Sequence, residues 1–434
     1  MTEYRPLQPN PAETEKELQK SDEALSGPSL AAPSRRNGPM LADLHLTHPK
    51  DQDARAISRR IVADVASAHA DDVDRQARFP IEAIDALKKE RLLGALVPVE
   101  LGGLGLGISE LAGICEAIAQ RCASAGMIFA MHQIQVACLV RHAASSAHHR
   151  RYLTELCDRQ LLIASVTSEV GVGGDTRQSI CAVEREGERF RLLKQATTVS
   201  YGAYADDLLV TCRRTPDAAS GDQVLVLLRK ANYVLTQTST WDTLGMRGTC
   251  SPGFTLDSSG DAEQVVPGSF VDSSAQTMVP FSHILWSAVW LGIASDAVAR
   301  AGTFVRSEAR KTPGTVPPTA HRLAELSAHL QLMRTNVDAV TAECDRLIAS
   351  QDGNDALLGM GFALKMNNLK VTSSRLAAEI VQQALLICGV MGYRNDTKYS
   401  LGRHLRDSLS AALMIGNDRI LSKSASLLLV YKEE

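Results

Sequence analysis

The chain has 434 residues, of which 45% are hydrophobic and only 4% are aromatic. A chain of this length buries a large core and predicts two or three domains, and abundant Ala, Leu and Val favour helical packing. The formal net charge of −3 leaves no basic footprint for a nucleic-acid partner.

The cysteines and the hydropathy of the chain indicate the cellular compartment in which we expect the protein. Nine cysteines are scattered along the chain without a CxxC pair, so we expect buried thiols in a reducing compartment, with neither disulfides nor a metal site. No apolar run of about 18 residues stands out, and the N-terminus lacks the apolar segment of a signal peptide. We therefore expect a cytoplasmic protein without a membrane span.

Hydrophobic periodicity divides the chain into four segments. Residues 1–52 are rich in Pro, Ser, Glu and Asn and predict a disordered tail. Helical spacing of apolar residues predicts a helical domain over 53–159, short β-rich runs predict a β-domain over 160–275, and the helical period returns over 276–434. The expected fold class is α+β and mostly α, with an N-terminal helical domain, a middle β-barrel or sandwich, and a C-terminal four-helix bundle.

Within these segments the periodicity also predicts individual elements. In the first domain the expected helices are 81–93, 109–121, 124–142 and 148–158. The expected strands are 161–166, 189–193, 207–212, 224–228, 233–238 and 253–256. The bundle is expected as four long helices, which are 281–311, 319–350, 354–389 and 398–431.

Two turns of the expected β-domain combine glycine with hydroxyl side chains. Thr167–Asp175 follows a strand, and its glycines let the backbone approach a ligand while its hydroxyls and N–H groups hydrogen-bond a polar edge. Thr198–Gly202 repeats the pattern, with Ser200 as the central hydroxyl. Taken alone, the first segment is a Gly-rich turn and the second a polar β-turn.

Three more segments carry candidate binding residues. Trp241–Thr249, with the sequence WDTLGMRGT, predicts a loop in which two glycines flank Arg247. Arg310 precedes Gly314, and an arginine suits a pyrophosphate because it donates two parallel hydrogen bonds, although it also suits the end of a helix. Leu386–Tyr393 contains two glycines and, taken alone, is a helix C-cap.

In this order and spacing, the five segments resemble the motifs of the acyl-CoA dehydrogenase family over roughly residues 55–430. WDTLGMRGT is similar to the family's LGMRGS/T run, and Thr167–Asp175 resembles its T-E-P-x-A-G-S-D loop. The resemblance implies an enzyme of fatty acid metabolism that binds FAD between the β-domain and the bundle and forms a homotetramer or homodimer.

The resemblance also implies which residues form the site. The implied cofactor contacts are Val166, Thr167, Ser168, Gly173, Thr198, Ser200, Arg310, Gly389, Gly392, Gly416 and Asn417. The implied substrate contacts are Gly174, Arg247, His283 and Met414. Arg310, Gly389 and Gly392 match positions that reach the FAD of a neighbouring subunit, and Thr198 stands where the family has a tryptophan against the flavin ring.

The residue that should start the family's chemistry is missing. Members remove a proton from Cα of an acyl thioester with a glutamate, whose pKa an apolar site raises. Ile415 occupies the position where most members carry that glutamate, and Ser282 occupies the position used by a minority. His283 is the candidate base, because imidazole has an unperturbed pKa near 6.5, unless it only lines the pocket or caps a helix. Asp418 is a further candidate.

Four functions stay open. The leading one is an FAD-dependent acyl-CoA dehydrogenase-like oxidoreductase, which oxidises the α,β bond of a CoA or carrier-protein thioester with a relocated base and passes electrons to a flavoprotein or reductase. The second is a flavin-dependent monooxygenase or oxidase on the same fold, which needs no such base. The third is a non-catalytic flavoprotein, and the fourth is a binding module without a cofactor.

Overall fold

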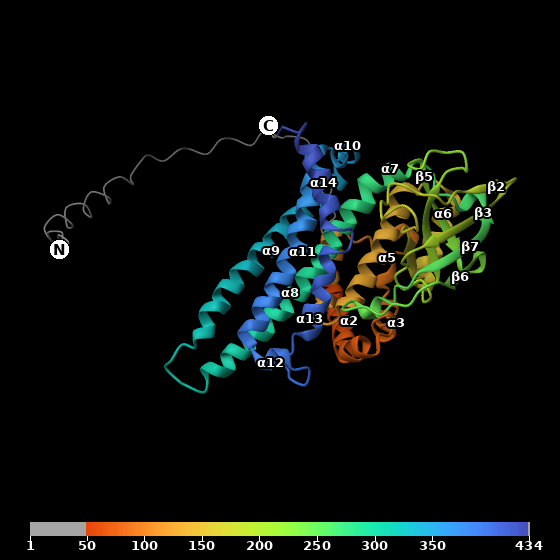
Figure 1. The fold of residues 1–434 in the computed structure, drawn as a ribbon. Coiled ribbons are helices and arrows are strands. Elements are labelled where there is room, and N and C mark those ends of the chain that lie inside the picture. The colour runs from red at the N-terminus through yellow and green to blue at the C-terminus, as the bar shows by residue number, and fades with distance from the viewer. Residues whose placement is uncertain (1–48, 433–434) are drawn as a thin grey trace, which may run out of the picture. The chain divides into compact units, whose positions relative to one another are not determined.

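The computed structural model describes residues 49–432, with side chains from Arg59 onward (Figure 1). The described residues from 52 onward form one compact unit. Most of the expected tail, 1–52, lies outside the described residues. Its last positions belong to helix α2 (Pro49–Gln76), so this helix begins before the boundary expected at residue 53, and a proline suits its first turn.

The N-terminal domain is helical, as predicted. After α2 its helices are α3 (Ile81–Lys89), α4 (Ile108–Ala119), α5 (Ala123–His142) and α6 (Ala147–Arg159), with short 3-10 turns at Leu92–Gly94 and Val99–Leu101. Helix α5 is almost wholly buried and contacts α4, helix α8 of the bundle and strand β1. In Figure 1 the strands lie on one side of α5 and the bundle on the other, so this helix joins the domains that form the site.

The middle domain consists of two small sheets. Its strands are β1 (Ile163–Val166), β2 (Glu184–Glu186), β3 (Arg189–Ala196), β4 (Asp207–Arg213), β5 (Gln223–Arg229), β6 (Tyr233–Gln237) and β7 (Phe254–Asp261). One sheet has the order β1-β4-β5, with β1 parallel to β4, and the other is antiparallel with the order β2-β3-β7-β6. Strand β2 was missed because its three residues are all exposed, which leaves no alternation to detect.

The C-terminal part is the predicted helical bundle. After α7 (Phe270–Ser273) and a π-helical turn (Ser274–Met278), it contains α8 (Val279–Ala309), α9 (Pro318–Ala349), α10 (Gly353–Leu357), α11 (Met360–Cys388), α12 (Val390–Tyr393), α13 (Gly402–Leu409), a 3-10 turn (Ser410–Ala412) and α14 (Asn417–Leu428). Helices α8, α9 and α11 contact one another, and α11 also contacts α13 and α14. Apolar side chains from these helices and from α4 and α5 form one continuous core.

The prediction of one long helix over 398–431 was wrong. The segment begins with a loop and is then broken between α13 and α14, where Ile415 adopts a positive φ of 50° and Gly416 has a non-helical ψ of 129°. Buried Lys370 of α11 stabilises the break, because its Nζ donates to the carbonyl oxygens of Ala411 (3.1 Å) and Ile415 (3.0 Å) and to Oδ1 of Asn417 (2.7 Å). A lysine thus satisfies carbonyls that a continuous helix would have satisfied internally.

The expectation that no segment is long and apolar enough to cross a membrane was also wrong. By length and composition alone, two described helical segments meet that criterion, Ala123–His142 and Phe270–Ala309. In both, 89% of the apolar window is buried inside the protein, which is the pattern of core helices.

Candidate functional site

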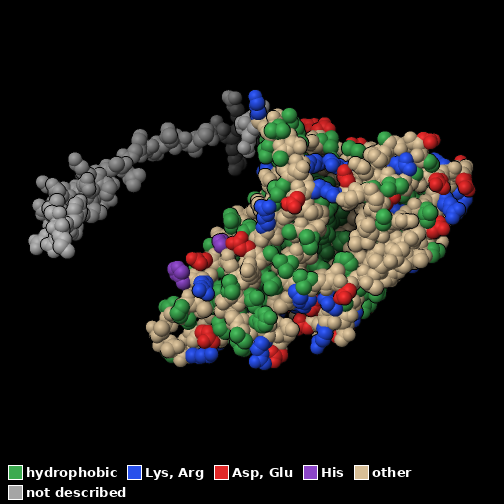
Figure 2. Space-filling model, in the orientation of Figure 1, with side chains coloured by type: hydrophobic (Ala, Val, Ile, Leu, Met, Phe, Trp, Pro, Cys, Tyr) green, Lys and Arg blue, Asp and Glu red, His purple; other side chains and the backbone are tan. Residues whose placement is uncertain are grey.

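A cavity of about 940 Å³ lies where the β-domain meets α5, α8 and the broken C-terminal segment. Its lining residues come from both turns singled out in the sequence, from the WDTLGMRGT loop and from residues 406–419. Figure 2 shows a hollow in this face of the protein, with hydrophobic side chains inside it. The cavity therefore brings together segments that are distant in the sequence.

One wall of the cavity is rich in hydroxyl groups. Its hydroxyl-bearing residues are Ser165, Thr167, Ser168, Thr198, Ser200, Thr249 and Ser251. Several of them hydrogen-bond one another: Ser251 Oγ donates to Ser200 Oγ at 2.9 Å, and Ser168 Oγ donates to the carbonyl oxygen of Thr198 at 2.7 Å. These contacts fix the side chains in position and leave further donor and acceptor capacity for a ligand.

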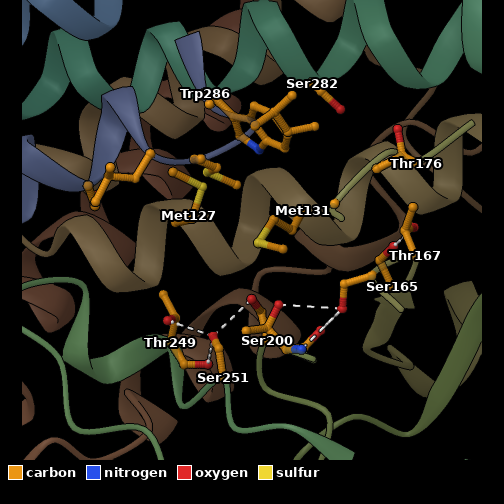
Figure 3. Close-up of a pocket in the computed structure, with 18 of the residues that line it drawn as sticks. Met127, Met131, Ser165, Thr167, Thr176, Ser200, Thr249, Ser251, Ser282 and Trp286 are labelled. Carbon is orange, nitrogen blue, oxygen red and sulfur yellow. Dashed lines mark hydrogen bonds between the residues drawn. The ribbon is translucent and has the colours of Figure 1, made fainter. Parts of the chain in front are cut away.

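The opposite wall is apolar. In Figure 3, Met127 and Met131 of α5 lie between Trp286 of α8 and the hydroxyl side chains. Leu413 and Met414 of the broken segment complete this side. The cavity therefore has one polar and one apolar wall, and methionine side chains adapt readily to the shape of a ligand.

His283 lines the apolar side and is buried. Its Nδ1 lies 3.0 Å from the carbonyl oxygen of Met366, so Nδ1 carries the proton and Nε2 is the acceptor. Burial lowers the pKa of His283 to about 4, so the imidazole is neutral at pH 7. A group with this pKa is a weak base for a Cα proton, but its Nε2 can accept a hydrogen bond from a ligand.

Neither family position for the base holds a carboxylate in the cavity wall. Ser282 is buried on α8, and Ile415 lies at the break between α13 and α14. Among the described lining residues the carboxylates are Asp175 and exposed Asp418. Burial acts to raise the pKa of Asp175, but hydrogen bonds from Arg177 outweigh it and lower that pKa, so Asp175 is a poor proton acceptor.

The WDTLGMRGT loop divides between two cavities. Its Trp241 and Met246 line the flank of the first cavity, whereas Arg247 does not and points instead to a second cleft. Asp407 Oδ1 accepts a hydrogen bond from the backbone N–H of Met246 at 2.7 Å. Gly245 packs so closely against helix α13 that an added Cβ would lie 2.2 Å from the carbonyl oxygen of Arg406.

The structure brings many of the predicted site residues to this cavity. Those that line it are Thr167, Ser168, Gly174, Thr198, Ser200, Ser282, His283, Met414, Ile415, Gly416 and Asp418. Those that do not line it are Val166, Gly173, Arg247, Arg310, Gly389, Gly392 and Asn417. Val166 is buried within β1, and Asn417 binds Lys370 instead of facing the cavity.

Arg310 ends α8, about 36 Å along the helix axis from Trp286. Within one chain it therefore cannot reach the cavity. That Arg310, Gly389 and Gly392 contact the cofactor of a neighbouring subunit stays a prediction.

The residues of the apolar wall and the lysine behind it were not predicted from the sequence. Met127, Met131 and Trp286 belong to apolar helices, where core packing is the ordinary role of such side chains. Lys370 did carry a signal, because it shares the buried face of α11 with Met366 and Ala377. A lysine on such a face is rarely without a specific partner.

The two walls fit a flavin. An isoalloxazine ring has apolar faces and a polar edge, so the hydroxyl wall matches the edge and the methionine and indole side chains match a face. Gln135 also lines the cavity, and its buried Oε1 has no hydrogen-bond partner among the described residues. The arrangement is that of a flavoenzyme built from a helical domain, a β-domain and a helical bundle.

The chain belongs to the acyl-CoA dehydrogenase family. Residues 48–160 match the model of the acyl-CoA dehydrogenase N-terminal domain, and residues 273–425 match that of the C-terminal domain. The family consists of flavin-dependent oxidoreductases, so this protein is a flavoenzyme, and the family assignment inferred from the five motifs is confirmed.

Proteins similar to this chain carry the names of different enzymes. Amino sugar nitrososynthase DnmZ of Streptomyces peucetius is 27% identical, over 89% of this chain and 95% of that protein. Cyclohex-1-ene-1-carbonyl-CoA dehydrogenase of Syntrophus aciditrophicus is 24% identical, over 83% and 85%. The FMN-bound structure of TdsC from Paenibacillus sp. A11-2, a dibenzothiophene monooxygenase, has a TM-score of 0.76 and 19% identity, over 88% and 98%, and so shares the fold.

Proposed function

We propose that this protein is a flavin-dependent monooxygenase that receives its electrons from a separate reductase. One observation carries the proposal: both positions at which the family places its glutamate, Ile415 and Ser282, lack a carboxylate, and the neighbouring His283 is a weak base. Removing a proton from Cα of a thioester requires a well-placed base. Oxygenation does not, because a reduced flavin held between the two walls of the cavity would supply that chemistry, with one atom of O₂ going to the substrate and the other to water.

The nitrogen of an amino group is the oxygenation site we favour. Among the relatives reported above, a nitrososynthase of amino sugars is similar over most of both chains. An amino sugar has hydroxyl groups as well as an amine, and the hydroxyl wall of the cavity can hydrogen-bond them. Amino sugars are therefore the first substrate class to test.

The side chains of the cavity have separate tasks in this proposal. His283 accepts a hydrogen bond at Nε2 from the substrate N–H, because its own proton is held on Nδ1 by Met366. That contact directs the nitrogen lone pair toward the oxygen donor without removing a proton from carbon. Met127, Met131 and Trp286 exclude water from the apolar side, which protects a reactive oxygenating species.

FAD is the flavin that we propose, in line with the family resemblance. The TdsC structure contains FMN, so the identity of the bound flavin is to be measured directly, by chromatography of the flavin released from purified protein. We further propose a cytoplasmic homotetramer or homodimer, in which Arg310 and Gly389 of one subunit approach the cofactor of another.

Oxidation of an acyl thioester at its α,β bond is the second candidate. It is favoured by the similarity to cyclohex-1-ene-1-carbonyl-CoA dehydrogenase and by the WDTLGMRGT loop, part of which lines the cavity. In this case the substrate is a CoA or carrier-protein thioester, an electron-accepting flavoprotein is the partner, and a base other than glutamate is needed.

A reductase-coupled assay tests the proposal. Flavin-loaded protein is mixed with a flavin reductase, NADH, O₂ and a panel of amino sugars, and oxygenated products are detected by mass spectrometry. We expect a product that depends on O₂ and on this protein. His283→Gln should keep its flavin and lose about tenfold in turnover, the value of one hydrogen bond, while His321→Gln, at an exposed site on α9, should be unchanged.

The proposal fails if no amine in the panel is oxygenated while acyl-CoA thioesters reduce the flavin. A His283→Gln variant with wild-type turnover would leave the monooxygenase reading intact but remove the orienting role of the imidazole.

A further inference from the structure

A second cavity of about 660 Å³ lies beside the first, and its charge is unusual. It is bounded by α2, the WDTLGMRGT loop, α8 and the segment before and within α13. The residues that line it are Asp71, Asp74, Arg75, Thr243, Leu244, Arg247, Arg300, Asn395, Thr397, Ser400, Arg403, His404 and Arg406. We call it the arginine cleft, because five arginines face two aspartates in its lining.

Three of the arginines already have partners. Arg406 forms a two-pronged ion pair with Asp74, and Arg300 binds Asp296 at 2.7 Å. Arg403 is mostly buried, and its Nε lies 3.3 Å from Oδ1 of Asp71. Because the side chain of Asp71 is 84% exposed, this ion pair is weak.

Arg247 has no partner among the residues whose side chains the structure describes. No hydrogen bond or ion pair joins its guanidinium to any residue between 59 and 432, and its Nε is buried. Arg75 also lines the cleft, is exposed, and forms no ion pair within the described part of the chain. A half-buried guanidinium without an acceptor is costly unless a ligand supplies one.

We propose that the arginine cleft binds a phosphate or diphosphate group. After the internal ion pairs are formed, Arg75 and Arg247 still carry positive charge in the cleft. Their combined charge is more than a single carboxylate would neutralise. The planar fork of an arginine matches two phosphate oxygens. Asn395 and Ser400 add polar side chains that can donate to further oxygens of the same group.

The position of the cleft suits a ligand that also enters the flavin cavity. Thr243, Leu244 and Arg406 line both cavities, so one short segment and one side chain separate them. The phosphate is therefore expected on an organic molecule, either the substrate or the diphosphate of FAD. Affinity of the cleft for phosphate does not depend on which reaction the flavin cavity performs.

Isothermal titration of full-length protein loaded with FMN, which has no diphosphate that could occupy the cleft, with inorganic pyrophosphate tests the proposal. We expect saturable binding, with a Kd at least about tenfold higher in Arg247→Gln and raised in Arg75→Gln, because each change removes a charge-assisted contact. Arg185→Gln, on exposed strand β2, is the matched control and should bind like the wild type. The flavin absorbance of each variant confirms that it is folded.

Absence of saturable pyrophosphate binding, or an unchanged Kd in both Arg247→Gln and Arg75→Gln, would overturn the proposal. Two further titrations identify the source of the phosphate. A loss of FAD affinity without a loss of FMN affinity in Arg247→Gln assigns the cleft to the cofactor diphosphate. Unchanged FAD affinity together with weaker binding of ADP assigns it to a nucleotide-bearing substrate, and either result supports a phosphate site.

Discussion

Lys370 provides the sharpest structural test, because one side chain stabilises the break that replaces a continuous helix at the cavity. It is 0% exposed, and its Nζ binds the carbonyl oxygens of Ala411 and Ile415 and the side chain of Asn417. In Lys370→Met the two carbonyls lose this donor, at about 1 to 3 kcal/mol each. Asn417 Oδ1 still accepts from Ser374 at 3.3 Å.

The loss is partly offset because Lys370→Met no longer buries an ammonium group. Burial lowers the pKa of Lys370 to about 8, so the charged form predominates at pH 7. We expect a net local destabilisation of about 3 kcal/mol. A local free energy of this size raises amide exchange by roughly a hundredfold.

Hydrogen exchange measured by mass spectrometry over residues 410–420 is the assay. Lys365→Met is the control on the same helix, since Lys365 is 44% exposed and pairs with Glu343 at the surface, and such pairs contribute about 0 to 1 kcal/mol. If exchange in 410–420 rises no more in Lys370→Met than in Lys365→Met, the lysine does not hold the break and the reasoning is refuted.

Three further predictions concern the same region. Ile415→Gly should leave the free energy of unfolding unchanged or raise it by up to about 1 kcal/mol. The positive φ costs isoleucine about 1 to 2 kcal/mol, which exceeds the backbone entropy that glycine loses on folding. Leu413→Gly should instead lower the free energy of unfolding measured in urea, and equal losses in the two variants would contradict this prediction. Gly245→Ala should cost about 1 to 3 kcal/mol or more from overpacking, whereas Gly416→Ala meets open space and should be tolerated in the same measurement. Burial lowers the pKa of His283 to about 4, so as the pH falls the imidazole is protonated in the unfolded chain before it is protonated in the folded protein. Up to about 3 kcal/mol of stability should therefore be lost as pH falls from 6.5 to 4. In His283→Gln this pH-dependent loss of unfolding free energy should be absent.

Much of the fold was predictable because its determinants are local. Helical spacing in the N-terminal domain and the bundle, and period-two alternation such as that of β3, are direct consequences of which face is buried. The turns at Thr167–Asp175 and Thr198–Gly202 combine glycine with hydroxyl residues, and their resemblance to acyl-CoA dehydrogenase motifs identified them as site elements. The structure places both turns in the cavity wall.

What the sequence could not reveal depends on contacts between distant segments. Apolar residues continue at helical spacing through 398–431. Nothing within that segment shows that Lys370, on another helix, donates hydrogen bonds to the carbonyl oxygens at the break. The weak basicity of His283 likewise follows from burial against α11, not from its neighbours in sequence. The arginine cleft needs Arg75, Arg247 and Arg403 from three separate elements, so it emerges only from the folded chain.

The most direct test of the central claim is anaerobic mixing of the purified flavoprotein with a series of acyl-CoA thioesters, followed by flavin absorbance in a stopped-flow instrument. With no carboxylate at Ile415 or Ser282, we predict that the oxidised flavin band persists with every thioester and bleaches only when dithionite or a reductase is added. Rapid bleaching by an acyl-CoA, with formation of the α,β-unsaturated thioester, would contradict the account and establish the protein as a dehydrogenase with a base at another position.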